Sequence, residues 1–168
     1  MSRFQFEIAT HGDDRAIRSL LEEAVMPGRV SVTFRREPSF FDGLVVDGGF
    51  RQVMIVRQRS TGRIAGLGCR SVRTMWVNGR ARAVGYLNGL RILEPYRSAL
   101  LLARGYAFLK KLHGDGRTEL YLTTIAEGND SATALLTSRR AGLPTYRDTG
   151  KYHTLVVPLR RRFRGRQT

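Results

Sequence analysis

An arginine and a serine stand at the start of an apolar helical pattern, where they could bind a phosphate group. Residues 87–112, LNGLRILEPYRSALLLARGYAFLKKL, read as a strand that stops at Pro95, followed by an amphipathic helix with Ser98 as its N-cap. The free N–H groups of the first helical turn attract anions, and Arg97 adds a positive charge beside them. The segment suits a pyrophosphate, although an ordinary strand and helix crossover with a surface arginine is the alternative.

Other reactive residue types give weaker signals. The single cysteine, Cys69, lies in an apolar run, so we expect a buried core thiol rather than a nucleophile. One cysteine excludes an internal disulfide and fits a reducing compartment. His11, His113 and His153 lie in separate segments without ligand spacing, so no metal site is predicted. The first residues lack the apolar region of a secretion signal, and we expect a cytoplasmic protein.

Net charge is the unusual term in the composition. The 168 residues include 29 Lys and Arg against 14 Asp and Glu, a formal charge of +15 that attracts polyanions. We expect one domain over residues 1–159 and a flexible basic tail over residues 160–168 that makes nonspecific polyanion contacts. No zinc spacing, basic zipper or RNA-binding pattern accompanies the charge, which favours a solvated basic face. No run is long enough for a membrane span, and a monomer or homodimer is expected.

The N-terminal third predicts one strand and two helices. Alternating apolar and polar residues indicate a strand over residues 4–10. Residues 13–25 place their apolar side chains on one helical face, with acids in the first turn. A short helix is expected over residues 39–44.

The middle of the chain predicts an antiparallel meander. Residues 51–58 and 63–77 have strong strand patterns, and the glycines at 66 and 68 are expected to mark a bulge. Asn78-Gly79 favours a type I′ turn because both central positions need positive φ, and the partner strand is residues 82–92. The remaining expected elements are a helix to His113, a strand over residues 118–125, a helix from Asn129 to Arg140 with Gly142 as its C′ residue, and strands near residues 145–148 and 152–157.

This order of elements, together with three segments, resembles the GNAT superfamily of N-acetyltransferases over residues 4–159. YRSALLLARGYAFLKKL occupies the place of the family's pyrophosphate loop and the helix that follows it. GYLNGLRILEPYR resembles the family's fourth strand and its turn into the cofactor site, and EGNDSATALLTSRRAGLPTY resembles the family's late helix. The resemblance implies an α/β (α+β) fold with a central mixed, mostly antiparallel sheet of six to seven strands. About four helices would flank the sheet, which would be split between its fourth and fifth strands.

The resemblance also implies acetyl-CoA as co-substrate, without a metal. Leu90, Arg91 and Ile92 would pair through their backbone with the pantetheine arm, and the N–H near Leu90 would polarise the thioester carbonyl. The family's phosphate loop has glycines where this chain has serine and leucine, so the leucine side chain must point away from the ligand. The other implied cofactor contacts are Arg97, Ser98, Ala99, Leu100, Leu101, Leu102 and Asn129.

The family's catalytic residues have no direct counterparts at the matching positions of this chain. The family's tyrosine proton donor on the late helix falls here on Ser138 or Leu136, so Tyr146 is the substitute, with Tyr121 and Tyr152 as alternatives. Glu127 is the first candidate for the base, because it follows the fifth strand at the mouth of the split, and Glu94 is the second. Deprotonation through water without a dedicated base is the further option.

Three functions follow from these observations. The first is an N-acetyltransferase that moves an acetyl group from acetyl-CoA to an amine by direct attack; the amine acceptor, a small molecule or a peptide, is not specified by the sequence. The second is a degenerate acyl-CoA-binding or regulatory module, suggested by the altered loop and the missing tyrosine. The third is a nonspecific polyanion-binding protein, suggested by the charge alone.

Overall fold

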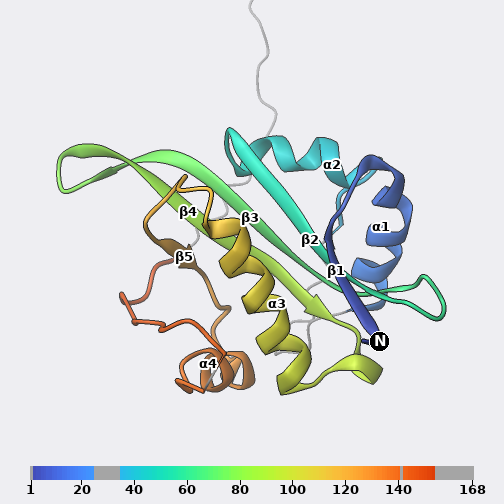
Figure 1. The fold of residues 1–168 in the computed structure, drawn as a ribbon. Coiled ribbons are helices and arrows are strands. Elements are labelled where there is room, and N and C mark those ends of the chain that lie inside the picture. Colours follow the sequence, from blue (N-terminus) through green and yellow to red (C-terminus); the bar gives the residue numbers. More distant parts are fainter. Residues whose placement is uncertain (1, 25–34, 141, 154–168) are drawn as a thin grey trace, which may run out of the picture.

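The computed structural model describes residues 2–24, 35–140 and 142–153. In these ranges helices pack on both faces of one twisted mixed sheet (Figure 1). The expected basic tail, residues 160–168, lies outside the described residues. The elements are β1 (Phe4–Ile8), a 3₁₀ turn η1 (His11–Asp13), α1 (Asp14–Glu23), α2 (Phe40–Gly43), η2 (Leu44–Asp47), β2 (Phe50–Gln58), β3 (Ile64–Val77), β4 (Arg80–Ile92), η3 (Glu94–Tyr96), α3 (Ala99–His113), β5 (Tyr121–Thr123) and α4 (Asp130–Leu136).

The sheet has five strands in the described part of the chain, in the order β1-β2-β3-β4-β5. The first four are antiparallel neighbours, and β5 pairs parallel with β4. This confirms the mixed, mostly antiparallel sheet, but the expected count of six to seven strands is wrong for these residues. The segment 145–148 forms no strand because Tyr146 turns toward α3 and bonds Tyr106 instead. The last expected strand, residues 152–157, lies mostly outside the described residues.

Two further expected boundaries are corrected. The fifth strand is three residues long rather than residues 118–125, because the Thr118 hydroxyl bonds the carbonyls of Ala83 and Leu120. The late helix ends at Leu136, with Thr137 as its C-cap, and it cannot continue to Arg140 because Arg139 adopts a positive φ of 53°. Gly142 is therefore not its C′ residue. None of the helices within the described ranges is both long and apolar enough to cross a membrane.

Each face of the sheet has its own apolar core. Helices α1 and α2 cover one face, where Ile17 and Phe40 pack against Ile55 of the central strands. Helix α3 covers the other face, where Leu101 packs against Val56. This layering follows from period-2 strands facing helices with a 3.6-residue apolar stripe.

The lone thiol belongs to the first of these cores. Cys69 is buried there, and burial raises its pKa to about 12. A thiol with so high a pKa stays protonated at neutral pH, because the thiolate would be poorly solvated. The predicted core role of Cys69 is confirmed.

A fully buried arginine ties the α3 face together. The guanidinium of Arg70 on β3 donates to the Tyr121 hydroxyl (2.7 Å), to Gln52 Oε1 (2.9 Å), to the Leu112 carbonyl (3.0 Å) and to Asp115 Oδ1 (2.7 Å). This guanidinium holds the pKa of the Asp115 carboxyl below its usual value. The four bonds connect β2, β3, β5 and the end of α3, so Arg70 fixes the short β5 against the sheet.

Candidate functional site

The fourth and fifth strands pair over only three residues. β5 pairs with Gly85, Tyr86 and Leu87, whereas residues 88–92 of β4 have no strand on that side among the described residues. A bulge lies in β4 where the β3–β4 register shifts, and Gly89 adopts a φ of +65° there, which favours glycine. The bulge turns β4 away from β5 and opens the sheet.

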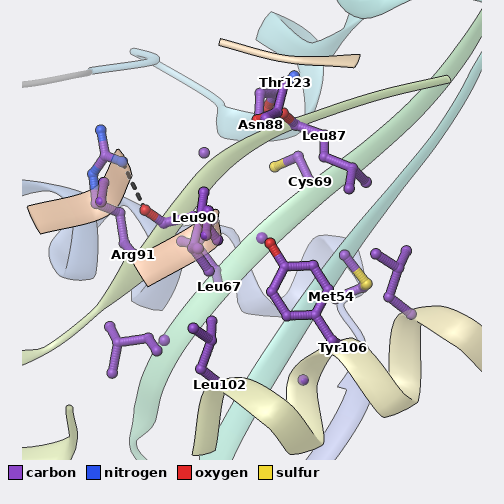
Figure 2. Close-up of a pocket in the computed structure, with 18 of the residues that line it drawn as sticks. Met54, Leu67, Cys69, Leu87, Asn88, Leu90, Arg91, Leu102, Tyr106 and Thr123 are labelled. Carbon is purple, nitrogen blue, oxygen red and sulfur yellow. Dashed lines mark hydrogen bonds between the residues drawn. The ribbon is translucent and has the colours of Figure 1, made fainter. Parts of the chain in front are cut away.

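A cavity of about 220 Å³ fills this opening. Figure 2 shows residues of β3, β4 and α3 pointing into it from several sides. Most of its lining is apolar, as in sites that hold the hydrophobic part of a ligand and orient it with a few polar groups. Lining residues come from β4 (Leu87 to Ile92), from the end of β5 (Thr123 to Ala126), from α3 (Leu101, Leu102, Gly105, Tyr106, Phe108 and Leu109) and from α4 with its flank (Asn129, Ala132, Leu136 and Tyr146).

A glycine on β3 leaves part of this space open. Gly68 lines the cavity, and a Cβ atom added there would lie 3.7 Å from Met54 Cε and 4.0 Å from Leu90 Cδ1, both ordinary contacts. At Gly66 an added Cβ would lie 2.6 Å from the Arg91 carbonyl oxygen, so that glycine is required by the fold. The missing side chain at Gly68 therefore serves the cavity rather than the packing.

The N-terminus of α3 opens beside the cavity. Ser98 is its N-cap, as predicted, and its hydroxyl accepts from the Leu101 N–H at 3.1 Å. The N–H groups of Ala99 and Leu100 have no acceptor among the described residues. The side chain of Leu100 is 71% exposed and lies outside the cavity lining. The helix thus presents free donors and a positive dipole end without obstruction.

Arginine side chains bond two carbonyls of the diverging strand. Arg91 Nη1 donates to the Leu90 carbonyl at 2.8 Å, and Arg97 Nε donates to the Ile92 carbonyl at 3.1 Å. Burial lowers the pKa of Arg91, which lines the cavity. Because both donors are flexible side chains, a ligand with amide N–H groups can replace them at these carbonyls.

Two tyrosine hydroxyls meet at the wall of the cavity. Tyr106 on α3 and Tyr146 after α4 are joined by a hydrogen bond of 2.7 Å. Burial raises the pKa of both hydroxyls, so both carry protons at neutral pH. Figure 2 shows the Tyr106 ring rising from α3 toward β3 and β4. Tyr106 was not predicted from the sequence, although its helical spacing from Leu102 and Leu109 places all three on one face.

Helix α4 closes the cavity on the β5 side. Asn129, which lines the cavity, caps this helix as expected, since its Oδ1 accepts from the Ala132 N–H at 3.3 Å. The side-chain oxygen of Asn129 is therefore occupied, whereas its side-chain NH2 group makes no hydrogen bond to the described residues and can donate to a ligand.

No carboxylate or histidine lines the cavity. All 14 acidic side chains and all three histidines fall within the described residues, and none is among the lining residues. The side chain of Glu127 is 90% exposed and lies 3.6 Å from Lys151 Nζ. Glu94 is exposed in η3. Of the alternative tyrosines, Tyr121 bonds the buried arginine and Tyr152 is exposed, and neither lines the cavity.

No protein-family model matches the chain, and no curated protein matches it. The fold is similar to an acetyltransferase from Trypanosoma brucei (16% identity, TM-score 0.64, covering 92% of this chain and 99% of that one). It is also similar to the aminoglycoside 6'-N-acetyltransferase AAC(6')-Ih from Acinetobacter baumannii (11%, 0.67, 93% and 99%). AAC(6')-Iy, solved with the bisubstrate analogue CoA-S-monomethyl-acetylneamine, matches at 15% identity (0.65, 92% and 100%).

Proposed function

We propose that this chain, which has the fold of the GNAT N-acetyltransferases, transfers an acetyl group from acetyl-CoA to an amine. The observation that carries the proposal is the cavity between the diverging strands β4 and β5, with the open N-terminus of α3 at its side. A similar structure, AAC(6')-Iy, was solved with a ligand that contains CoA. Fold alone does not fix function, so the proposal rests on the groups around the cavity.

The arrangement of these groups suits a CoA thioester. The free N–H groups of Ala99 and Leu100, with Arg97, supply donors and charge for the pyrophosphate. The carbonyls of Leu90 and Ile92 are positioned to accept from the amides of the pantetheine arm once the arginine side chains move. The thioester then lies at the bulge, above Gly68.

The reaction needs two proton transfers and one stabilised charge. The amine nitrogen attacks the thioester carbonyl carbon, the carbon–sulfur bond breaks, the nitrogen loses a proton and the departing thiolate gains one. The N–H of Leu90 stabilises the negative charge that develops on the carbonyl oxygen. The linked hydroxyls of Tyr106 and Tyr146 supply the proton for sulfur, because burial keeps both protonated.

Replacing Tyr106 with phenylalanine should slow the transfer without weakening acetyl-CoA binding. We expect kcat to fall by about 100-fold, the lower end of what general acid–base catalysis contributes, while KM for acetyl-CoA stays within about 2-fold. Steady-state kinetics on Tyr106→Phe, Tyr146→Phe and the double variant measure this. Losses in the double variant no larger than those in the worse single variant indicate that the two hydroxyls act as one unit. A raised KM with unchanged kcat would show that Tyr106 only packs against the substrate.

Water accepts the proton that the amine loses. Glu127, the first candidate from the sequence, is exposed and paired with Lys151, and no carboxylate of the described residues lines the cavity. Glu127→Gln should therefore keep kcat/KM within about 2-fold, and the rate should rise with pH through the pKa of the acceptor amine. A loss of about 100-fold or more would instead identify Glu127 as the base.

The acceptor can be sought among amines of the type that the similar proteins use. Their names specify aminoglycosides and glucosamine 6-phosphate, so amino sugars are the first group of a panel that also includes peptide N-termini. The test is acetyl transfer followed by thiol release across this panel. Binding of acetyl-CoA without transfer to any amine would favour an acyl-CoA-binding module.

A cytoplasmic location fits the single thiol, which no disulfide protects.

A further inference from the structure

The two longest strands extend beyond the rest of the sheet. Pairing of β2 with β3 ends at Val72, and pairing of β5 with β4 begins at Gly85. Residues 73–77 and 80–84 therefore pair only with each other, through the turn at Asn78-Gly79. Figure 1 shows this hairpin, the β3–β4 ribbon of residues 73–84, projecting at the left of the molecule. A two-stranded ribbon that stands apart from the sheet packs little core of its own. Its exposed side chains are therefore available to contact a partner.

One face of the β3–β4 ribbon carries a row of arginines. The register pairs Arg73 with Val84, Met75 with Arg82 and Val77 with Arg80, and cross-strand partners share a face. Successive levels are about 7 Å apart, so the three guanidinium groups are spread over about 14 Å. All three arginines are exposed, and no carboxylate of the described residues pairs with them.

The opposite face presents an aromatic ring near the tip. Trp76 faces Ala81 across the ribbon, and because alanine is too small to cover an indole, the side chain is 77% exposed. An exposed indole offers a flat surface on which a nucleic-acid base can stack. Because Trp76 lies on the face opposite the arginines, a strand that contacts both has to cross an edge of the ribbon.

We propose that the β3–β4 ribbon binds single-stranded nucleic acid, with phosphodiester groups on Arg73, Arg80 and Arg82 and a base stacked on Trp76. Phosphates suit guanidinium groups that have no carboxylate partner. A single strand is required because bases in a duplex are stacked on one another and do not offer a face to an exposed side chain. The net charge of +15 draws the polyanion toward the molecule.

Other occupants fit the ribbon less well. A second copy of the chain would bring two arginine rows of the same charge together. A membrane surface would accept the exposed Trp76 and Val77, but it would also have to bury the polar turn of Asn78, Gly79 and Arg80 that lies beyond them. An acidic protein segment would satisfy the arginines but would leave Trp76 without a stacking partner.

The only tryptophan of the chain is Trp76, so its fluorescence reports binding at the ribbon itself. Titration with an oligouridine of about 12 nucleotides should quench this fluorescence, with an affinity that falls as salt rises. The triple variant Arg73→Gln, Arg80→Gln, Arg82→Gln should bind at least about 10-fold more weakly and lower the salt slope by about 2, because each lost phosphate contact removes about 0.7. Trp76→Ala, followed by anisotropy of a labelled oligouridine, should lose at least about 5-fold.

The matched control removes the same charge elsewhere. The triple variant Arg15→Gln, Arg59→Gln, Lys110→Gln alters three exposed residues that form no ion pair with the described part of the chain. It should keep at least about half of the affinity. Thermal unfolding of each variant checks that the fold is kept. Equal losses in both triple variants, binding that disappears only when residues 160–168 are deleted, or equal affinity for a duplex or for anionic lipid vesicles would overturn the proposal.

Discussion

Gly68→Leu should abolish measurable acetyl-CoA binding while leaving the protein folded. A Cβ atom at this position meets Met54 and Leu90 at ordinary contact distances, so the backbone and its neighbours need not move. The rest of the leucine side chain would project into the cavity of about 220 Å³, where the proposal places the thioester. We expect acetyl-CoA affinity to fall by at least about 100-fold, because a ligand cannot share a close-packed site with an added side chain.

Two variants control for other effects of this substitution. Gly68→Ala adds only the Cβ atom and should lower affinity by less than about 10-fold. Gly49→Leu places the same side chain where no atom lies within 4 Å of an added Cβ, and it should bind acetyl-CoA like the original chain. Calorimetry measures the affinity, and circular dichroism checks the fold. Unchanged binding by Gly68→Leu would mean that the thioester does not lie over β3.

Arg70→Leu should lower the free energy of unfolding by about 3–5 kcal/mol. The side chain of Arg70 has no exposed surface, and its removal leaves the Tyr121 hydroxyl, the Gln52 amide and the Leu112 carbonyl without their donor. Buried polar groups without partners cost more than the net value of the bonds themselves. Urea denaturation, read from the shift in midpoint and the slope, measures the change.

A second arginine at the same place provides a matched control. Arg117 also pairs with Asp115, at 3.3 Å, and also stacks on Phe50, but its side chain is 52% exposed. Arg117→Gln should therefore cost less than about 1 kcal/mol, because water replaces what is lost at an exposed ion pair. Similar losses at Arg70 and Arg117 would show that burial does not set the value of this network.

Elements with local chemical signals were predicted well from the sequence. The caps at Ser98 and Asn129 and the Asn78-Gly79 turn depend on one side chain or one dipeptide, and the structure has all three. The end of the sheet was not predicted well. Whether residues 145–148 join a sheet depends on a partner strand elsewhere in the chain. In the structure Tyr146 instead forms a hydrogen bond with the Tyr106 hydroxyl on α3.

The same contrast applies to the site. The helix N-terminus could be located from the sequence, since a cap and a break in the strand are local features. Gly68 could not be assigned to the cavity, because the face on which it lies follows from the register of β3 and from the bulge opposite it. Tyr106 was within reach of helical spacing, but only the position of Tyr146 shows why that hydroxyl matters.

Calorimetric titration of the protein with acetyl-CoA tests the central claim most directly. We predict one binding site for each chain, with a dissociation constant in the micromolar to submillimolar range that is common for enzyme substrates, and loss of that binding in Gly68→Leu. Absence of binding heat at millimolar acetyl-CoA, at two temperatures so that a zero enthalpy is not mistaken for no binding, would contradict the claim.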